Sequence, residues 1–291
     1  MTHILTLVAA RDSTSLTQSA IARVRDAVGG GDVTLLSPGE AVDIALPTPP
    51  DVAQVRAALG DAPIDVIATP AVDRRKRLLI ADMDSTIITG ETLDELAAHA
   101  GLGPKIAAIT ARAMNGELNF EDALRERVGM LKGLSVSALE QTWRGVRLPS
   151  GARRLVATMK AHGAYTALVS GGFTFFTSRV AALVGFDLHR SNTLLDNGTA
   201  LLGRVAEPIL GRAAKLATLR ELAAQHGLTL SAALAVGDGA NDLDMLLASG
   251  LGVAFHAKPI VAAAARARVD HADLRALLFA QGIPISAFAA E

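Results

Sequence analysis

The sequence predicts an α/β protein in which a doubly wound parallel sheet carries an inserted block of helices and follows a smaller α/β unit. Three patterns in the 291 residues support this fold class. Short apolar runs alternate with amphipathic segments between residues 78 and 255, which is typical of a parallel sheet. Four helical segments follow one another without a strand between residues 89 and 148. Half of the residues are hydrophobic and only 3% are aromatic, which favours a helix-rich core of Ala, Leu, Val and Ile.

The N-terminal segment shows the element order β-α-β-β-α-β, which is the ferredoxin-like pattern. Strands are expected at residues 3–9, 33–36, 41–46 and 64–68, and helices at about 13–28 and 50–59. The unit resembles the ACT-type regulatory modules, which implies an amino-acid effector and a homodimer formed through this domain. A packing or dimerisation domain without a ligand is the other interpretation. We expect this domain to span residues 1–72 and a second domain to span residues 73–291.

The second domain begins with a strand that ends in acidic residues. The run Leu78–Ala81 is apolar and branched, which predicts a strand buried on both faces. Asp82 and Asp84 follow it and are expected at the carboxyl edge of the sheet, where open parallel sheets bind ligands. Two acids at this edge indicate metal-assisted chemistry. The alternative is that they only cap the next turn, which Asp and Ser favour.

A helical cap is expected over this edge, at about residues 89–148, because no strand interrupts that segment. The alternation then resumes to the end of the sheet. The expected elements are a helix at 152–162, a strand at 165–169, a helix at 173–184, a hairpin at 194–205 with Asn197-Gly198 at its turn, a helix at 212–226, a strand at 232–236, a helix at 241–248 and a last strand at 251–255.

Composition excludes several classes of function. The formal net charge of −1 provides no basic field for nucleic acid, and the run Arg74–Arg77 fits a solvated linker better than a nucleic-acid patch. The absence of cysteine excludes disulfides and thiolate chemistry. The longest nearly uncharged stretch, Met245–Ala257, is shorter than the ~20 residues of a membrane helix. With no signal-peptide pattern at the start, we expect a cytoplasmic protein without a membrane partner.

Four polar groups follow apolar strands or begin helices in an order that brings them to one sheet edge. They are Asp82 with Asp84, the segment Ser170-Gly171-Gly172, Lys215, and the segment Gly237–Asp242. Taken singly, a helical lysine is usually solvated and a glycine-rich segment is usually a turn. Together they suit a dianion and a hard cation. Oxygen ligands, few in number, indicate Mg²⁺, with Asp82 and Asp238 as side-chain ligands.

The same residues suit phosphoryl transfer. Asp82 can attack phosphorus and form an aspartyl phosphate. Asp84, two residues on, can protonate the leaving oxygen and later accept a proton from water. Lys215 and the hydroxyl of Ser170 can hold the equatorial oxygens on which charge spreads in the transition state.

The chain resembles the haloacid dehalogenase (HAD) superfamily of aspartate-nucleophile phosphohydrolases. Four segments carry this resemblance: DMDST at 82–86, SGG at 170–172, Lys215, and GDGANDLDM at 237–245. Within the superfamily, the runs SGGFTFFT at 170–177 and GLGVAFHAKPIV at 250–261 are similar to the phosphoserine phosphatase family. The resemblance implies a HAD-type sheet with an inserted cap and Mg²⁺-dependent hydrolysis of O-phospho-L-serine, the last step of serine biosynthesis.

The resemblance also implies the residues of the site. Glu91 is expected to bind the ammonium of the substrate and Arg127 its carboxylate, for which a guanidinium fork is well suited. Met114 and Phe120 are expected to close over the ligand. The phosphate contacts are expected from Ser170, Gly171, Gly172, Lys215 and Asn241. The metal residues are expected to be Asp82, Asp84 through its backbone carbonyl, Asp238, and Asp242 beside them.

Two other functions stay open from the sequence. One is a phosphatase of the same superfamily for another small phosphorylated metabolite. The other is a phospho-accepting or amino-acid-sensing protein, against which Asp84 argues, because a proton donor beside a phospho-aspartate shortens its lifetime. Arg125 and Arg127 lie two residues apart in an expected helix, so only one of them can face the site.

Overall fold

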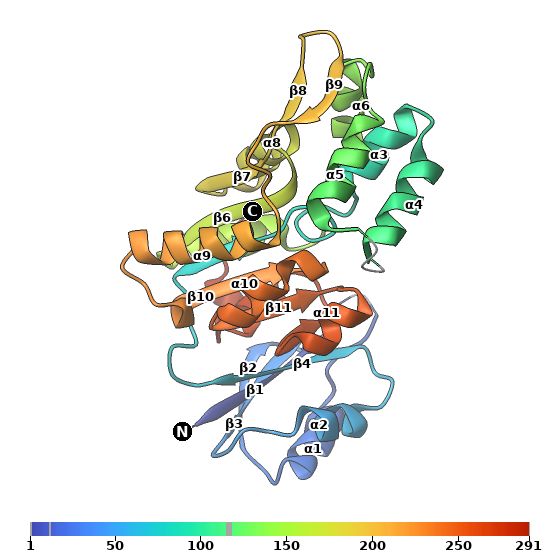
Figure 1. Ribbon diagram of the computed structural model, residues 1–291. Helices are drawn as coiled ribbons and strands as arrows, with labels where there is room; N and C mark the ends of the chain where they lie inside the picture. Colours follow the sequence, from blue (N-terminus) through green and yellow to red (C-terminus); the bar gives the residue numbers. More distant parts are fainter. Residues whose placement is uncertain (1, 12, 115–117, 291) are drawn as a thin grey trace.

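The computed structural model describes residues 2–11, 13–114 and 118–290. Figure 1 shows a small N-terminal sheet at the bottom, a larger sheet in the middle and a group of helices at the upper right. The fold class expected from the sequence is confirmed: the larger sheet is parallel, and helices are inserted after its first strand.

The N-terminal sheet is antiparallel and has the strand order β2-β3-β1-β4 of a ferredoxin-like unit. Its apolar residues alternate, so that Leu5, Leu7 and Ala9 of the first strand face one core together with residues of both helices. Thr17 and Asp51 cap the two helices by accepting backbone N–H groups. The elements are β1 (His3–Ala9), α1 (Gln18–Ala27), β2 (Asp32–Ser37), β3 (Ala41–Leu46), α2 (Val52–Leu59) and β4 (Ile64–Pro70).

The other face of this sheet packs against the second domain through buried acids. Asp65 accepts the backbone N–H groups of residues 270, 271 and 272 at 2.7, 3.2 and 2.7 Å. Asp43 pairs with Arg74, which also donates to the carbonyls of Phe279 and Ala280. The expectation of a solvated linker at 74–77 is therefore wrong for Arg74 and Lys76, which are half-buried and buried because they find acceptors at the junction of the two domains. Arg75 and Arg77 are exposed, as expected.

The six strands of the larger sheet are all parallel and have the order β12-β11-β10-β5-β6-β7. Leu79 and Ala81 of the central strand face one helical layer, and Leu78 and Ile80 face the other. The strands are β5 (Leu78–Ala81), β6 (Tyr165–Phe173), β7 (Leu188–Asn192), β10 (Ala233–Gly237), β11 (Leu251–Phe255) and β12 (Ala267–Val269). The first layer contains α7 (Ala152–Ala161), α8 (Thr174–Val184) and α12 (Ala276–Phe279), and the second contains α9 (Arg212–Gln225), α10 (Leu243–Ala248) and α11 (Pro259–Ala264).

Three features of this sheet differ from the expectation. Strands β7 and β12 were not anticipated, and Leu251–Phe255 is not the last strand. Strands β7 and β12 are short, lie at the two edges of the sheet and contain polar residues. They therefore lack the apolar run that identifies a central strand. The third difference is that β6 continues through Ser170-Gly171-Gly172 with a shift of register against β7, so this segment is not a turn.

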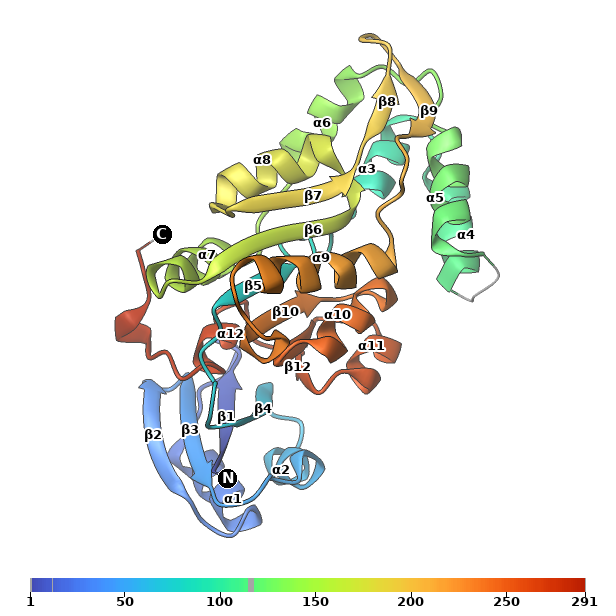
Figure 2. The ribbon, with the colours of Figure 1, turned by 60° about the vertical axis from the view of Figure 1, so that its left-hand side comes forward.

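The inserted helices form a cap beside the carboxyl ends of the strands (Figure 2). The two chain segments that enter and leave the cap are joined by the bond from Thr89 N to Arg147 O, 3.0 Å long. The hairpin, expected at 194–205, is bonded to the cap at residues 133–136. The elements are α3 (Thr92–His99), α4 (Gly103–Met114), α5 (Phe120–Gly129), α6 (Ser137–Gly145), β8 (Leu194–Asp196) and β9 (Leu201–Val205), and single helical turns lie at η1 (Leu230–Ala232), η2 (Ala240–Asp242) and η3 (Ile285–Ala287).

Among the residues that the structure describes, no helix has both the length and the apolar composition that a membrane crossing requires.

Candidate active site

Two neighbouring strands deliver acids to the same point of the sheet edge. Ala81 lies opposite Val236 in the parallel ladder between β5 and β10. The N–H of Asp82 still donates to the carbonyl of Val236 at 3.0 Å, so Asp82 extends the ladder by one residue. Asp238 follows β10 directly and is also buried. The register of this buried strand pair therefore brings the two carboxylates together.

A third buried acid, Asp242, completes a cluster. One oxygen from each of Asp82, Asp238 and Asp242 lies within 4.8 Å of the other two. Asp242 is in η2, and its Oδ2 accepts the N–H of Gly239 at 3.1 Å. Burial and the charges of Asp82 and Asp242 raise the pKa of Asp238 to about 8. Burial and the charge of Asp82 raise the pKa of Asp242 to about 6, although Lys215 opposes this rise.

This cluster fits a hard divalent cation. Its donors are carboxylate oxygens, and their mutual repulsion is relieved when a positive charge lies between them. Thr86 adds a hydroxyl that donates to Asp238 Oδ1 at 3.3 Å. The side chain of Asp84 is not part of the cluster among the described residues, so any metal contact from Asp84 would come from its backbone carbonyl.

Lys215 lies fully buried in the first turn of α9 and links two of the acids. Its Nζ is 2.8 Å from Asp82 Oδ1 and 2.6 Å from Asp242 Oδ1. Burial alone would lower the pKa of Lys215, but the two carboxylates outweigh this and hold the pKa above its ordinary value. The ammonium is therefore charged at the edge of the sheet, where it can hold an anion together with the metal.

Asp84 lies beside this cluster and has different partners. Its Oδ1 accepts the N–H of Thr92, the first residue of α3, at 2.8 Å. Its Oδ2 accepts the hydroxyl of Ser170 at 3.3 Å. Desolvation and the charge of Glu91 raise the pKa of Asp84 to about 7, and Asp82 adds to this rise. A carboxyl group with this pKa can exchange a proton near neutral pH.

The segment Ser170-Gly171-Gly172 approaches Asp84 closely. Gly172 N donates to Ser170 Oγ at 2.9 Å. A Cβ atom on Gly172 would lie 2.8 Å from Asp84 Oδ2, so only glycine leaves room for the carboxylate. The continuation of β6 through this segment thus places a hydroxyl and backbone groups beside the acids.

Of the cap residues expected from the sequence, two lie on the side of the acids. Glu91 Oε1 accepts the hydroxyl of Ser85 at 2.7 Å. Arg127 donates to Thr110 Oγ1 and to the carbonyl of Ala123. Burial lowers the pKa of Arg127, while the charges of Asp94, Glu91 and Asp84 raise it, so these acids are nearby.

The remaining expected residues have different outcomes. Arg125 is exposed and pairs with Glu207 at 3.0 Å, whereas Arg127 donates to Thr110 of α4, so the two arginines lie on different faces of α5. Phe120 contacts Gly171, and Asn241 lies in η2 next to Asp242. The side chain of Met114 lies outside the part of the chain that the structure describes.

Sequence reasoning missed three groups of this site. They are the hydroxyl of Thr86, the N–H of Thr92 at the start of the cap, and Lys258. The backbone N–H of Lys258 donates to Asp238 O at 3.2 Å, and its charge lowers the pKa of Asp238 against the larger effects that raise it. Thr86 and Lys258 belong to the motif segments DMDST and GLGVAFHAKPIV, so attention to every polar residue of those segments would have found them. The N–H of Thr92 has no signal in the sequence.

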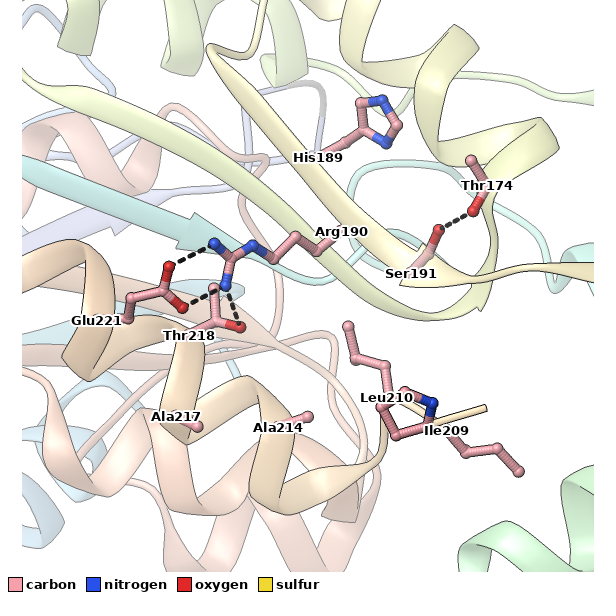
Figure 3. Close-up of a pocket in the computed structure, with 11 residues that line it drawn as sticks. Thr174, His189, Arg190, Ser191, Ile209, Leu210, Ala214, Ala217, Thr218 and Glu221 are labelled. Atoms are coloured by element: carbon pink, nitrogen blue, oxygen red, sulfur yellow. Dashed lines mark hydrogen bonds and ion pairs between the residues drawn. The ribbon is translucent and has the colours of Figure 1, made fainter. Parts of the chain in front are cut away.

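A cavity of about 480 Å³ lies between β7 and the first half of α9 (Figure 3). Arg190 makes a two-pronged pair with Glu221 there, at 2.6 and 2.7 Å. The acids of the cluster do not line this cavity. This cavity is therefore separate from the candidate site, which is defined by the carboxylates that meet around Lys215.

Comparisons with known proteins find related sequences and similar structures. Residues 79–247 match the family of haloacid dehalogenase-like hydrolases. A phosphoserine phosphatase of Streptomyces coelicolor is 46% identical over 227 residues, which cover 78% of this chain and 55% of that protein. The chain thus spans about half the length of some curated relatives that it matches.

Two solved structures extend the comparison. A probable phosphoserine phosphatase from Vibrio cholerae superposes with a TM-score of 0.79 at 33% identity, covering 98% of this chain and 88% of that chain. A phospho-aspartyl intermediate analogue of phosphoserine phosphatase superposes with a TM-score of 0.66 at 37% identity, covering 70% of this chain and 98% of that chain.

Proposed function

We propose that this chain, which belongs to the haloacid dehalogenase-like hydrolase family, is a Mg²⁺-dependent phosphatase that hydrolyses O-phospho-L-serine to L-serine and phosphate. One observation carries the proposal. Buried Asp82, Asp238 and Asp242 converge, Lys215 pairs with two of them, and Asp84, whose pKa is about 7, lies beside them. The similarity to phosphoserine phosphatases supports the choice of substrate.

Asp82 is the proposed nucleophile. Lys215 holds its Oδ1, so we assign Oδ2 to the attack on phosphorus. The new O–P bond forms as the bond from phosphorus to the serine oxygen breaks, and an aspartyl phosphate results. Lys215 and Ser170, with backbone N–H groups near Gly171 and Gly172, stabilise the charge on the equatorial oxygens.

Asp84 is the proposed acid and base. With a pKa of about 7 it carries a proton for part of the time at neutral pH and can give it to the departing serine oxygen. The resulting carboxylate then accepts a proton from the water that attacks the aspartyl phosphate. Phosphate leaves, and Asp82 and Asp84 return to their initial states.

The expected metal residues are Asp82 and Asp238 through their side chains and Asp84 through its carbonyl, with Asp242 beside them. Asn241 is expected as a contact near the phosphate. When bound, Mg²⁺ neutralises charge so that an anionic carboxylate can approach a phosphate dianion. Lys215 adds a positive charge of its own at this place, because it is buried and paired with Asp82 and Asp242.

The cap is proposed to recognise the serine part of the substrate. Glu91 would bind the ammonium, Arg127 the carboxylate, and Phe120 and Met114 would exclude water. Arg127 is half-buried without a carboxylate within ion-pair distance among the described contacts, which suits it to an anionic ligand. We expect this reaction to take place in the cytoplasm as the last step of serine biosynthesis.

Phosphate release from a panel of phosphorylated metabolites, with Mg²⁺ and with excess chelator, tests this function. We expect strong Mg²⁺-dependent preference for L-phosphoserine. Mg²⁺-dependent preference for another ester would keep the roles of Asp82 and Asp84 but reject the substrate. An acyl phosphate that forms and persists without hydrolysis would instead support a phospho-accepting protein.

We further propose that residues 1–72 form an ACT-like domain that binds an amino-acid effector and joins two copies of the chain. The edge strand β2 exposes Val33 and Leu35, at 41% and 60%, and its outer edge is unpaired in the described sheet. Sedimentation of wild type and Leu35→Lys tests the dimer: we expect the variant to be monomeric. A monomeric wild type would reject the dimer, and serine that changes neither activity nor Tm would reject serine as the effector.

A further inference from the structure

The aromatic ring of Phe120 in the cap lies directly over two glycines of the core domain. A Cβ atom on Gly171 would lie 2.9 Å from Phe120 Cζ, and a Cβ atom on Gly211 would lie 3.2 Å from Phe120 Cδ1. Both distances are shorter than ordinary carbon contacts of 3.5–4.0 Å. A Cβ atom on Gly171 would therefore force the ring to shift, and a Cβ atom on Gly211 would displace it by a few tenths of an ångström.

These two glycines are needed for space rather than for an unusual backbone. Gly211 has φ −112° and ψ −160°, an extended conformation that any residue adopts. Gly171 likewise has no positive φ. The two residues come from distant parts of the chain: Gly171 lies in the segment after Ser170, and Gly211 precedes the helix that carries Lys215.

The buried side chain of Asn192 joins the two segments. Its Nδ2 donates to the carbonyl of Gly171 at 2.8 Å and to the carbonyl of Leu210 at 3.2 Å. Its Oδ1 accepts the N–H of Leu210 at 2.7 Å. The amide therefore binds both backbone groups of the residue before Gly211 and the carbonyl of Gly171 at the same time. Each of these groups would be costly to leave unbonded in a buried place.

We infer that Gly171 and Gly211 form a seat for the cap residue Phe120, and that Asn192 is a positioning residue that holds the two halves of this seat together. The seat sets how far the cap descends toward Asp84 and Ser170. This inference rests on the proposed function in one respect, namely that closure of the cap accompanies binding of the substrate.

A size series at position 211 tests the seat. Gly211→Ala and Gly211→Val place one and then three carbon atoms beneath the ring, while Gly129→Ala is the matched control, because its Cβ would meet nothing within 4 Å. We expect kcat/KM to fall about tenfold for Ala and about a hundredfold for Val, chiefly through KM. Gly129→Ala should stay within about twofold of wild type.

The contact itself is tested by combining Gly211→Val with Phe120→Leu, which removes part of the ring. If the residues touch, the double variant retains more activity than the product of the two single effects predicts. The seat is overturned if the effects of the two substitutions on kcat/KM multiply. It is also overturned if Gly211→Val has the same kcat/KM as the Gly129→Ala control. Thermal unfolding of each variant separates a loss of cap closure from a loss of folded protein.

Asn192→Asp tests the positioning role, because it keeps the acceptor for Leu210 N and removes both donated bonds. The matched control is Asn197→Asp in the exposed hairpin turn, where Asn197 Oδ1 acts as an acceptor. We expect Asn192→Asp to raise KM as Gly211→Ala does, and Asn197→Asp to leave it unchanged. An unchanged KM for both would overturn the role of Asn192.

Each comparison uses the ester that wild type hydrolyses best. If this ester is not L-phosphoserine, the substrate assignment fails while the seat is still tested. If it is L-phosphoserine and the size series has no effect, the seat fails while the substrate assignment stands.

Discussion

Lys215 Nζ lies 2.6 Å from Asp242 Oδ1, and neither side chain is exposed to solvent. With Asp82 Oδ1 at 2.8 Å, one buried ammonium balances two buried carboxylates. Lys215→Met should lower turnover by about 10²–10³ through lost stabilisation of the transition state. It should also cost about 3–5 kcal/mol of unfolding free energy, because the carboxylates lose their partner. Phosphate release and urea unfolding measure the two effects.

Adding Asp242→Asn to Lys215→Met separates these effects. The double variant removes one of the unpaired charges and should regain part of the stability, but it should not regain activity. Recovery of both together would show that Lys215 acts only through folding.

Asp82→Asn and Asp84→Asn should affect different steps. Asp82→Asn is expected to abolish both turnover and the covalent phosphoenzyme, because its amide is a poor nucleophile. Asp84→Asn should slow turnover by about 10²–10⁴, the usual contribution of a proton donor or acceptor. Acid quenching with labelled substrate measures the phosphoenzyme. Labelled protein from Asp82→Asn would disprove its role as the nucleophile.

Removal of divalent cations should lower stability as well as activity. A cation held by the cluster of Asp82, Asp238 and Asp242 stabilises the folded state, by about 2.7 kcal/mol at a hundredfold excess over Kd. We expect Mg²⁺ to raise the Tm of wild type above its value in chelator, and Asp238→Asn to reduce this shift. An equal shift in both proteins would place the cation elsewhere.

Arg127 and its neighbour Arg125 provide a matched pair of variants. Arg127 is half-buried near the acids of the site, whereas Arg125 is exposed and pairs with the exposed Glu207. Arg127→Ala should lower kcat/KM for L-phosphoserine by about a hundredfold or more, since the substrate carboxylate would be desolvated without a partner. Arg125→Ala should change kcat/KM by less than about twofold, as exposed ion pairs contribute little. Equal losses would reject Arg127 as the carboxylate contact.

Asp273 should make part of the stability depend on pH. Burial tends to raise its pKa, but hydrogen bonds from Arg275 and from Ser150, which follows the cap, outweigh this and hold the pKa below its ordinary value. Because the folded pKa is below the unfolded value, these bonds stabilise the protein above pH ~4 and lose this effect as the pH falls through the folded pKa.

Asp273→Asn should therefore lower Tm at neutral pH and reduce the further loss of Tm in acid. Thermal unfolding of both proteins at about pH 7 and about pH 3 measures this. The same difference in Tm between the two proteins at both pH values would contradict the role of the carboxylate.

The order of elements and the acids of the site could be read from local signals. Leu78–Ala81 is apolar at every position, which identifies a strand buried on both faces and places Asp82 at its end. The hairpin turn at Asn197-Gly198 and the four cap helices also have strong local patterns. Strands β7 and β12 were missed because edge strands need no continuous apolar run. Arg74 and Lys76 of the linker were misjudged because their acceptors lie on β3 and at residues 231 and 279–280.

By itself, the sequence determined which reactive groups the site can contain, because carboxylates, a lysine and glycine-rich segments can be recognised at the ends of apolar strands. These groups indicate phosphoryl transfer with a metal ion. The tertiary structure decided which of these groups meet. Asp242 faces Lys215 across a separation of 27 residues, and Asn192 holds Gly171 and Leu210 from an edge strand. Phe120 rests on two glycines that are 40 residues apart in the chain. Such contacts depend on strand order and packing, which no local pattern encodes.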